Sequence, residues 1–224
     1  MTARGENESA FDARLYLVTD PAFDFEPLLP ALFDAGVTMI QVRDKRASDD
    51  DLARRVERVL RLAAPHGVTV VVNDRVKVAR TAGAHGVHLG QSDRSPAEAR
   101  RNLGTQAIVG LSLERTDHST SNDVSYAAVS PVYTTPTKTD TAPALGLDGV
   151  RSLCRTVKVP LVGIGGIDVH RAGDVVRAGA DGVAVISAIL GASNPVDAAR
   201  DMRNAVDEAL RSRSSPRAHD PDGA

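Results

Sequence analysis

The chain of 224 residues is 42% hydrophobic and 25% charged with a formal net charge of -2, which fits one globular domain with a full core. The near-neutral charge, the absence of Trp and the low aromatic content argue against a nucleic-acid-binding surface, which needs basic residues and stacking rings. No apolar run has the length of a membrane span or of the apolar part of a signal peptide, and the single cysteine, Cys154, rules out an internal disulfide, so we expect a cytoplasmic protein that contacts neither nucleic acid nor membrane.

Apolar runs alternate with helical patterns between two polar ends. The ends, residues 1–12 and 213–224, are aperiodic and predict disordered tails around a single domain of residues 13–212. Strand-like runs occupy residues 15–19, 38–42, 69–72, 86–89, 107–111, 126–129, 160–164 and 182–186. Helical patterns occupy residues 26–35, 50–64, 75–82, 96–102, 147–156, 169–178 and 195–210, with a weaker one at 117–123.

The strand patterns indicate a parallel sheet covered by helices. Residues 68–72 and 159–164 are nearly continuous apolar runs, which is typical of strands that are buried on both faces. Three helical patterns end in Ala-Gly, at Gly36, Gly83 and Gly179, where glycine can adopt the left-handed conformation that closes a helix. Eight alternating units predict an α/β protein with a TIM (β/α)8 barrel. A doubly wound open sheet is the alternative, but it usually has fewer strands, and its glycine-rich turn is missing after the first strand.

In such a barrel the active site lies at the carboxyl ends of the strands, so the residues that follow each strand are informative. The second strand runs into Gln41, Arg43 and Lys45, which alternate along the chain and therefore share one side. An amide and two cations at one point favour a phosphate-bearing ligand. Alone, the pattern would suit a solvated strand end better, so the interpretation depends on the other strands.

The next two strands lead to carboxylates. Asn73 and Asp74 end the third strand, and Asp93 follows the fourth. Since adjacent strands lie about 4.8 Å apart, both carboxylates can reach one cation, and Mg2+ typically takes one or two carboxylates together with substrate phosphate. Each Asp alone suits a helix cap or a turn equally well. Beside two cations, the pair favours a metal–pyrophosphate site.

Hydroxyl groups and a third cation follow the fifth and sixth strands. The hydroxyl of Ser112 can donate to a phosphate oxygen, but no nucleophile elbow surrounds it. The sixth strand leads into a connection of about 15 residues, a length that usually indicates a functional loop. It contains Thr135, Pro136, Thr137 and Lys138, although a surface loop stiffened by proline is the alternative.

Glycines follow the seventh strand. The segment Gly163-Ile-Gly-Gly-Ile167 allows backbone N–H groups to approach an anion, and Ile186-Ser187 ends the eighth strand. The loops after strands seven and eight form the recurrent phosphate site of these barrels. One cavity with a cationic side and a backbone-donor side predicts two phosphorylated substrates, one of which carries a pyrophosphate that leaves with its metal.

Together these motifs resemble the thiamine-phosphate synthase family. The similar segments span nearly the whole ordered chain, in the family's order: residues 41–45, 72–74, 88–93, 110–112, 135–138, 163–167 and 186–187. The resemblance implies a TIM-barrel enzyme that joins hydroxymethylpyrimidine diphosphate to a thiazole phosphate, carboxylated or plain, and releases pyrophosphate. The implied partners are thus small phosphorylated substrates, and a homo-oligomer is left open.

The resemblance also implies roles for individual residues. The pyrimidine diphosphate would be held by Gln41, Arg43, Lys45, Asn73, Ser112 and Lys138, of which Arg43, Lys45, Ser112 and Lys138 are the expected catalytic residues. Asp74 and Asp93 would bind one Mg2+ per subunit. The thiazole phosphate would be held by Thr135, Pro136, Thr137, Gly166, Ile186 and Ser187. The thiazole nitrogen carries no proton, so no general base is needed, and His88 is interpreted as a packing or strand-end hydrogen-bonding residue.

Two positions depart from the family pattern. Ser130 replaces an expected glycine, and Glu114 with Arg115 replaces an expected small residue and histidine, so both departures can reshape the pyrimidine pocket. Three alternatives remain: a thiazole tautomerase-like enzyme, a Schiff-base aldolase with Lys138 as nucleophile, and a non-catalytic barrel that binds thiamine phosphate.

Overall fold

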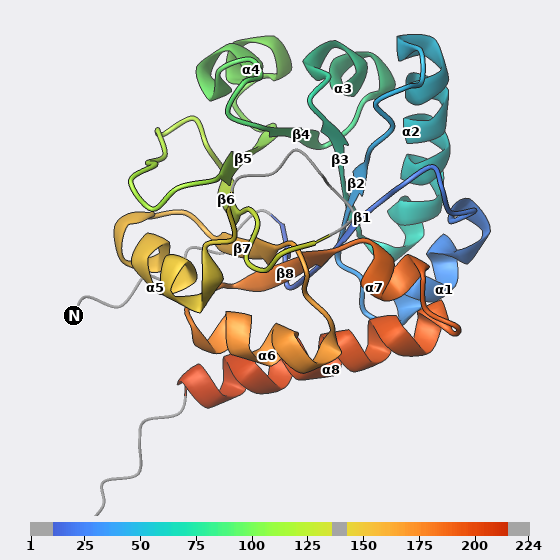
Figure 1. Cartoon of the computed structure of the whole chain (residues 1–224). Coiled ribbons are helices and arrows are strands. Elements are labelled where there is room, and N and C mark those ends of the chain that lie inside the picture. The colour runs from blue at the N-terminus through green and yellow to red at the C-terminus, as the bar shows by residue number, and fades with distance from the viewer. Residues whose placement is uncertain (1–10, 136–142, 215–224) are drawn as a thin grey trace, which may run out of the picture.

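The computed structural model describes residues 11–135 and 143–214, and these residues form a closed barrel of eight parallel strands (Figure 1). Each strand pairs with the next along the chain, and β8 pairs with β1. The strands are β1 (Leu15–Val18), β2 (Met39–Val42), β3 (Thr69–Asn73), β4 (Gly86–Leu89), β5 (Ile108–Leu113), β6 (Tyr126–Val129), β7 (Leu161–Ile164) and β8 (Gly182–Val185). The TIM-barrel prediction is confirmed, and the open-sheet alternative is wrong.

Helices surround the barrel, and α6 and α8 pack along each other beneath it in Figure 1. They are α1 (Leu29–Asp34), which follows the 3-10 turn η1 (Glu26–Leu28), α2 (Asp49–Ala63) with η2 (Ala64–His66), α3 (Val76–Ala82), α4 (Pro96–Leu103), α5 (Gly146–Thr156), α6 (Val169–Arg177), α7 (Ser187–Leu190) and α8 (Pro195–Ser214). None of the helices in the described ranges is long and apolar enough to cross a bilayer.

The helix boundaries follow local capping chemistry. The hydroxyl of Ser48 accepts from Asp51 N at the start of α2, and that of Ser95 accepts from Glu98 N at the start of α4. The glycines predicted to close helices have positive φ angles of 111° at Gly36, 70° at Gly83 and 124° at Gly179. These turns return the chain to the next strand.

Two elements differ from the sequence-based expectation. The weak helical pattern at residues 117–123 is wrong, because this segment forms bends and turns between β5 and β6. It is rich in Ser, Thr, Asn and Asp, whose side chains bond to nearby backbone groups and so favour turns over helix. Helix α7 was not expected, because one turn that begins at Ser187 is too short to show a helical period.

The first described residues belong to the barrel. The ring of Phe11 lies 5.6 Å from that of Tyr126, and Asp12 accepts from Arg14 Nε at 3.0 Å. Both residues fall within the expected tail of residues 1–12, and α8 extends to Ser214, beyond the expected limit of 212. The domain therefore begins and ends slightly outside the predicted boundaries.

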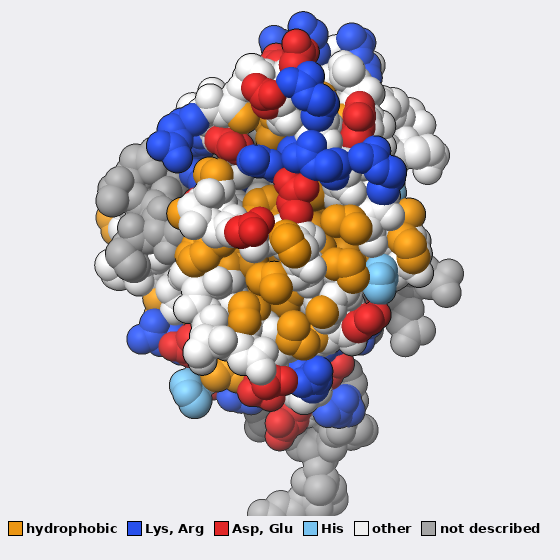
Figure 2. Space-filling view, turned by 90° about the vertical axis from the view of Figure 1, so that its right-hand side faces the viewer, with side chains coloured by type: hydrophobic (Ala, Val, Ile, Leu, Met, Phe, Trp, Pro, Cys, Tyr) orange, Lys and Arg blue, Asp and Glu red, His pale blue; other side chains and the backbone are white. Residues whose placement is uncertain are grey.

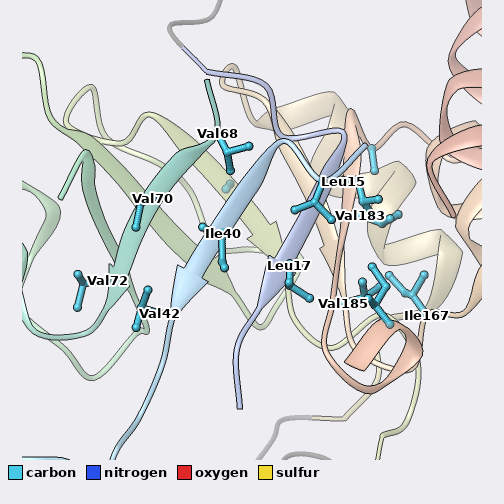
Figure 3. Close-up of a cluster of buried hydrophobic side chains, with 14 of the residues drawn as sticks. Leu15, Leu17, Ile40, Val42, Val68, Val70, Val72, Ile167, Val183 and Val185 are labelled. Carbon is cyan, nitrogen blue, oxygen red and sulfur yellow. The ribbon is translucent and has the colours of Figure 1, made fainter. Parts of the chain in front are cut away.

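Side chains alternate between two buried layers along every strand. Leu15, Leu17, Ile40 and Val42 belong to the large cluster between strands and helices, shown in Figure 3. The alternate positions fill the barrel interior, where a smaller cluster contains Tyr16, Val18, Met39, Val71, Tyr126, Val162 and Ala184. Inward-facing residues near the strand ends therefore face the cavity.

One face of the molecule is notably apolar. Figure 2 shows hydrophobic side chains gathered at its centre, between charged groups above and below. The segment between β1 and α1 lies on this side, and its Pro21, Ala22 and Pro27 are exposed.

Candidate active site

A cavity of about 560 Å³ opens at the carboxyl ends of the strands. Every described residue that the sequence assigns to the site lines it: Gln41, Arg43, Lys45, Asn73, Asp74, Asp93, Ser112, Thr135, Gly166, Ile186 and Ser187. Pro136, Thr137 and Lys138 lie outside the described residues. The convergence of the strand ends is thus observed, whereas the binding role of each residue stays a prediction.

Asp74 and Asp93 meet at the rim of this cavity. Asp74 has a φ angle of 60°, rare for a residue with a side chain, in a tight turn that Arg75 N closes on Asn73 O at 2.6 Å. Asp93 accepts from Gly90 N at 2.7 Å through Oδ2. Burial, followed by a hydrogen bond with Asp93 and the negative charge of Asp93, raises the pKa of Asp74 to about 6, while Lys45 opposes the shift.

This carboxylate pair fits a divalent cation. Two like charges held this close disfavour double ionisation unless a cation lies between them. The described residues contain no group of three or more His, Cys, Asp or Glu that could hold a metal. A bound ion would therefore take its remaining ligands from water and substrate oxygens, the usual arrangement for Mg2+.

The cations beside the pair remain available for a ligand. Within residues 11–135 and 143–214, neither Arg43 nor Lys45 forms a side-chain ion pair. By contrast, Arg55 pairs with Asp44 at 2.9 Å, and Asp44 also accepts from Ala47 N at 3.1 Å. The loop after β2 is thus held by Asp44, which leaves Arg43 and Lys45 to the cavity.

Arg75 joins this loop to the turn that carries Asp74. Its Nη2 donates to Lys45 O at 3.0 Å, and its Nη1 donates to Ala47 O at 2.7 Å and pairs with Asp49 at 3.1 Å. The backbone at Lys45 is therefore fixed relative to Asp74. The sequence carries no signal for this role of Arg75, because an arginine at the start of a helix usually faces solvent.

The opposite wall is formed by the loops after β6, β7 and β8. Gly166 has a φ angle of 62°, and a Cβ there would lie 2.7 Å from Thr134 O, so only glycine fits. Arg171 Nη1 donates to Gly166 O at 2.8 Å, and its guanidinium lies 4.9 Å from the centre of the Tyr133 ring. These contacts join the glycine loop to the loop that contains Thr135.

A chain of buried polar side chains runs beneath the cavity. Gln41 Nε2 donates to Tyr16 Oη at 2.7 Å, and the hydroxyl oxygens of Tyr16 and Tyr126 are 2.9 Å apart. His88 Nδ1 lies 2.8 Å from Tyr126 Oη, and His88 Nε2 lies 3.0 Å from Ser112 Oγ. His88 thus makes strand-end hydrogen bonds, as expected.

The two tyrosines were not recognised from the sequence. Tyr16 and Tyr126 occupy inward-facing strand positions, where a hydroxyl amid apolar neighbours is the only available signal. Gly110, on the neighbouring strand β5, leaves the space that the Tyr126 ring occupies, because a Cβ at Gly110 would lie 2.2 Å from the ring's Cζ.

The departures from the family pattern both reach the cavity. Ser130 and Glu114 line it, whereas Arg115 is exposed and pairs with Asp117 at 2.5 Å. Asp168, the N-cap of α6, also lines it and was not expected.

Comparisons with known proteins agree with these features. A family model described as "Thiamine monophosphate synthase" matches residues 15–189. The chain is 44% identical to the thiamine-phosphate synthase of Albidiferax ferrireducens over 201 residues, which cover 87% of this chain and 92% of that protein. It is 45% identical to that of Xanthobacter autotrophicus over 203 residues, with 88% and 96% covered.

A solved structure shares the fold. The thiamine phosphate pyrophosphorylase of Pyrococcus furiosus aligns with a TM-score of 0.79 at 30% identity, covering 88% of this chain and 96% of that one. The family match, the two bacterial relatives and the closed barrel agree with the strand-end motifs. The chain therefore belongs to the thiamine-phosphate synthase family, whose members are transferases of thiamine biosynthesis.

Proposed function

We propose that this cavity joins hydroxymethylpyrimidine diphosphate to a thiazole phosphate, releases pyrophosphate and uses one Mg2+ held by Asp74 and Asp93. The observation that carries the proposal is the meeting of this carboxylate pair with Arg43 and Lys45, which follow β2, across one cavity from Gly166. A diphosphate needs the cations and the metal on the side of Arg43 and Lys45, and a monophosphate suits the backbone donors on the side of Gly166.

The chemistry requires charge stabilisation more than proton transfer. The carbon–oxygen bond to the pyrophosphate breaks with both electrons leaving on oxygen, and the lone pair of the thiazole nitrogen forms the new carbon–nitrogen bond. Arg43 and Lys45 stabilise the charge that builds on the leaving group, and Lys138 is proposed to add a third cation. When bound, Mg2+ supplies further charge neutralisation at the pyrophosphate oxygens.

Ser112 and the glycine loop position the two substrates. Ser112 lies on the cavity wall beside His88 and is proposed to bond a phosphate oxygen of the diphosphate. Gly166, Ile186 and Ser187 are proposed to offer backbone groups to the thiazole phosphate, and Thr135 lines the same cavity. Pro136 and Thr137, assigned to this ligand by the family resemblance, lie outside the described residues. Holding both substrates at one point lowers the entropic part of the barrier.

A thiazole tautomerase is the less favoured alternative. That reaction needs a histidine that can exchange a proton with substrate. Both ring nitrogens of His88 lie within hydrogen-bonding distance of side chains, Tyr126 and Ser112, so His88 is poorly placed for it. A Schiff-base aldolase would form a borohydride-trappable adduct at Lys138, and a non-catalytic barrel would bind thiamine phosphate without turnover.

One coupled assay tests the proposal. Pyrophosphate release should require both substrates and Mg2+, and excess chelator should abolish it. Asp93→Asn and Lys45→Met should each lower turnover by roughly 10²-fold or more. Asp50→Asn and Lys77→Met, which change exposed helical residues of the same types, are the matched controls and should leave turnover unchanged.

Two outcomes would contradict the proposal. Full activity in excess chelator would show that the reaction does not require Mg2+. Binding of thiamine phosphate without turnover would favour the non-catalytic barrel. A cytoplasmic location stays a prediction, which fractionation would test, and light scattering would decide the oligomeric state, which the resemblance leaves open.

A further inference from the structure

The buried polar chain connects two walls of the cavity through the barrel interior. Its members come from five strands, and the contact between Tyr16 of β1 and Tyr126 of β6 crosses the barrel, because these strands are not neighbours in the sheet. Gln41, Tyr16, Tyr126 and His88 are only 4%, 1%, 0% and 8% exposed. Gln41 and Ser112, the two ends, line the cavity together with His88, whereas the tyrosines do not.

Starting from the amide of Gln41, the number of available protons gives the order of donors and acceptors along this series of hydrogen bonds. Burial raises the pKa of Tyr16 and of Tyr126 above the ordinary tyrosine value, so each hydroxyl keeps its single proton. Tyr16 accepts from Gln41 Nε2, so its own proton points to Tyr126. Tyr126 must then donate to His88 Nδ1, which leaves the ring proton of a neutral His88 on Nε2.

The last step reaches the cavity. His88 Nε2–H donates to Ser112 Oγ, so the hydroxyl proton of Ser112 is left for a ligand. At the other end, Gln41 uses its side-chain nitrogen Nε2 for Tyr16, and its side-chain oxygen Oε1 accepts no bond from the described residues. Ser112, at one end of this series of hydrogen bonds, therefore donates to a ligand, and Gln41, at the other end, accepts from one.

The reversed order has the opposite consequence. If Gln41 accepted from Tyr16, every proton would shift one place, and Ser112 would donate to His88. Ser112 would then have only lone pairs for the cavity. A phosphate oxygen is an acceptor, so an anion at Ser112 excludes the reversed order.

We propose that Tyr16 and Tyr126 are positioning residues that fix His88 as its Nε2–H tautomer and keep Ser112 as a donor to the diphosphate and Gln41 as an acceptor for a donor group carried by the pyrimidine. The ligand-facing part of this inference rests on the proposed function. The two ends of one substrate are then recognised as a unit, because neither end group can reverse without the other.

The tautomer of His88 tests the proposal in the ligand-free protein. In 15N-labelled protein, two-bond nitrogen–proton couplings distinguish the tautomers, and loss of a signal in His88→Gln assigns it. We expect a neutral ring with its proton on Nε2. A proton on Nδ1, or on both nitrogens at pH 7.5, would overturn the proposal, and neither result depends on turnover.

Tyr126→Phe tests the link to the ligand. The variant keeps the ring beside Phe11 and His88 but removes the donor to His88 Nδ1. We expect a mixture of tautomers, a roughly 3- to 10-fold weaker affinity for magnesium pyrophosphate and a similar rise in the KM for the pyrimidine substrate, with kcat changed less. An unchanged tautomer together with unchanged affinity would contradict the proposal.

Two further variants complete the test. Lys77→Met, an exposed change on α3 away from the buried polar side chains, is the control and should match the wild type. Tyr16→Phe leaves Tyr126 free to donate to His88, so the Nε2–H tautomer and pyrophosphate affinity should persist while the KM for the pyrimidine substrate rises. Loss of pyrophosphate affinity in Tyr16→Phe would contradict the order of the chain. Inactive wild-type protein would instead count against the proposed function alone.

Discussion

Arg75 donates a hydrogen bond from Nη2 to the backbone carbonyl of Lys45 at 3.0 Å. The arginine directly follows Asp74, so a single side chain fixes the distance between a predicted metal ligand and a predicted phosphate-binding lysine. This relationship makes Arg75 a positioning residue, because its contacts are to backbone and to Asp49.

Replacing Arg75 by methionine should therefore impair the site while the fold persists. We expect kcat/KM to fall roughly 10- to 100-fold, mainly through a higher KM for the diphosphate and a higher Mg2+ requirement. Steady-state kinetics at several Mg2+ concentrations measure this. Arg80→Met, an exposed change on α3, is the control, and equal effects of both variants would refute the positioning role.

Asp74→Asn should stabilise the metal-free protein while it removes turnover. A carboxyl group whose folded-state pKa is raised contributes stability that is lost as pH rises from 3.8 to about 6, so the ionised pair costs stability at pH 7.5. Discounted for solvent screening, relief of about 1 kcal/mol corresponds to a Tm rise of roughly 2–4 °C. Asparagine also tolerates the positive φ angle. A lower Tm without metal would contradict the repulsion.

Mg2+ affinity should weaken on acidification. A proton on Asp74 competes with the metal, so the apparent Kd for Mg2+ should be constant above pH 7 and rise about tenfold per pH unit below about 6. Calorimetric titration at constant ionic strength measures this. A Kd that does not change between pH 5 and pH 7 would show that Asp74 is not a ligand.

Gly166→Ala should damage the thiazole-phosphate side selectively. The methyl group would meet Thr134 O at 2.7 Å, so the glycine loop must shift. We expect the KM for the thiazole phosphate to rise roughly tenfold or more. Gly67→Ala is matched in backbone conformation, with a φ angle of 65°, but has no atom within 4 Å of the new methyl group. It should cost a similar backbone strain of about 1–2 kcal/mol without a change in KM.

The strand ends could be predicted because their geometry is local. Alternation along a strand puts Gln41 and Ser112 on the inner face of the barrel, and repetition of eight units puts their ends on one rim. Even the carboxylate pair follows from two neighbouring strands. Once the barrel is assumed, these residues need no further information to converge.

Contacts that cross the barrel could not be predicted in this way. Tyr16 and Tyr126 meet because their strands face each other across the interior, and no local pattern encodes that distance. Arg75 lies at the start of a predicted helix, but its bonds to the preceding loop depend on side-chain conformation, which the sequence pattern does not encode. The helix predicted for residues 117–123 is wrong for a different reason, because a polar run without apolar residues at helical spacing has no face to pack against the barrel.

The space above Gly110 has a consequence for related sequences. A methyl group there and the Tyr126 ring cannot occupy the same volume, since their atoms would lie 2.2 Å apart. In any relative with a larger residue at the position of Gly110, a smaller partner must replace the tyrosine, so the two sites are bound to co-vary. Any redesign of this part of the barrel interior must therefore change the two residues together.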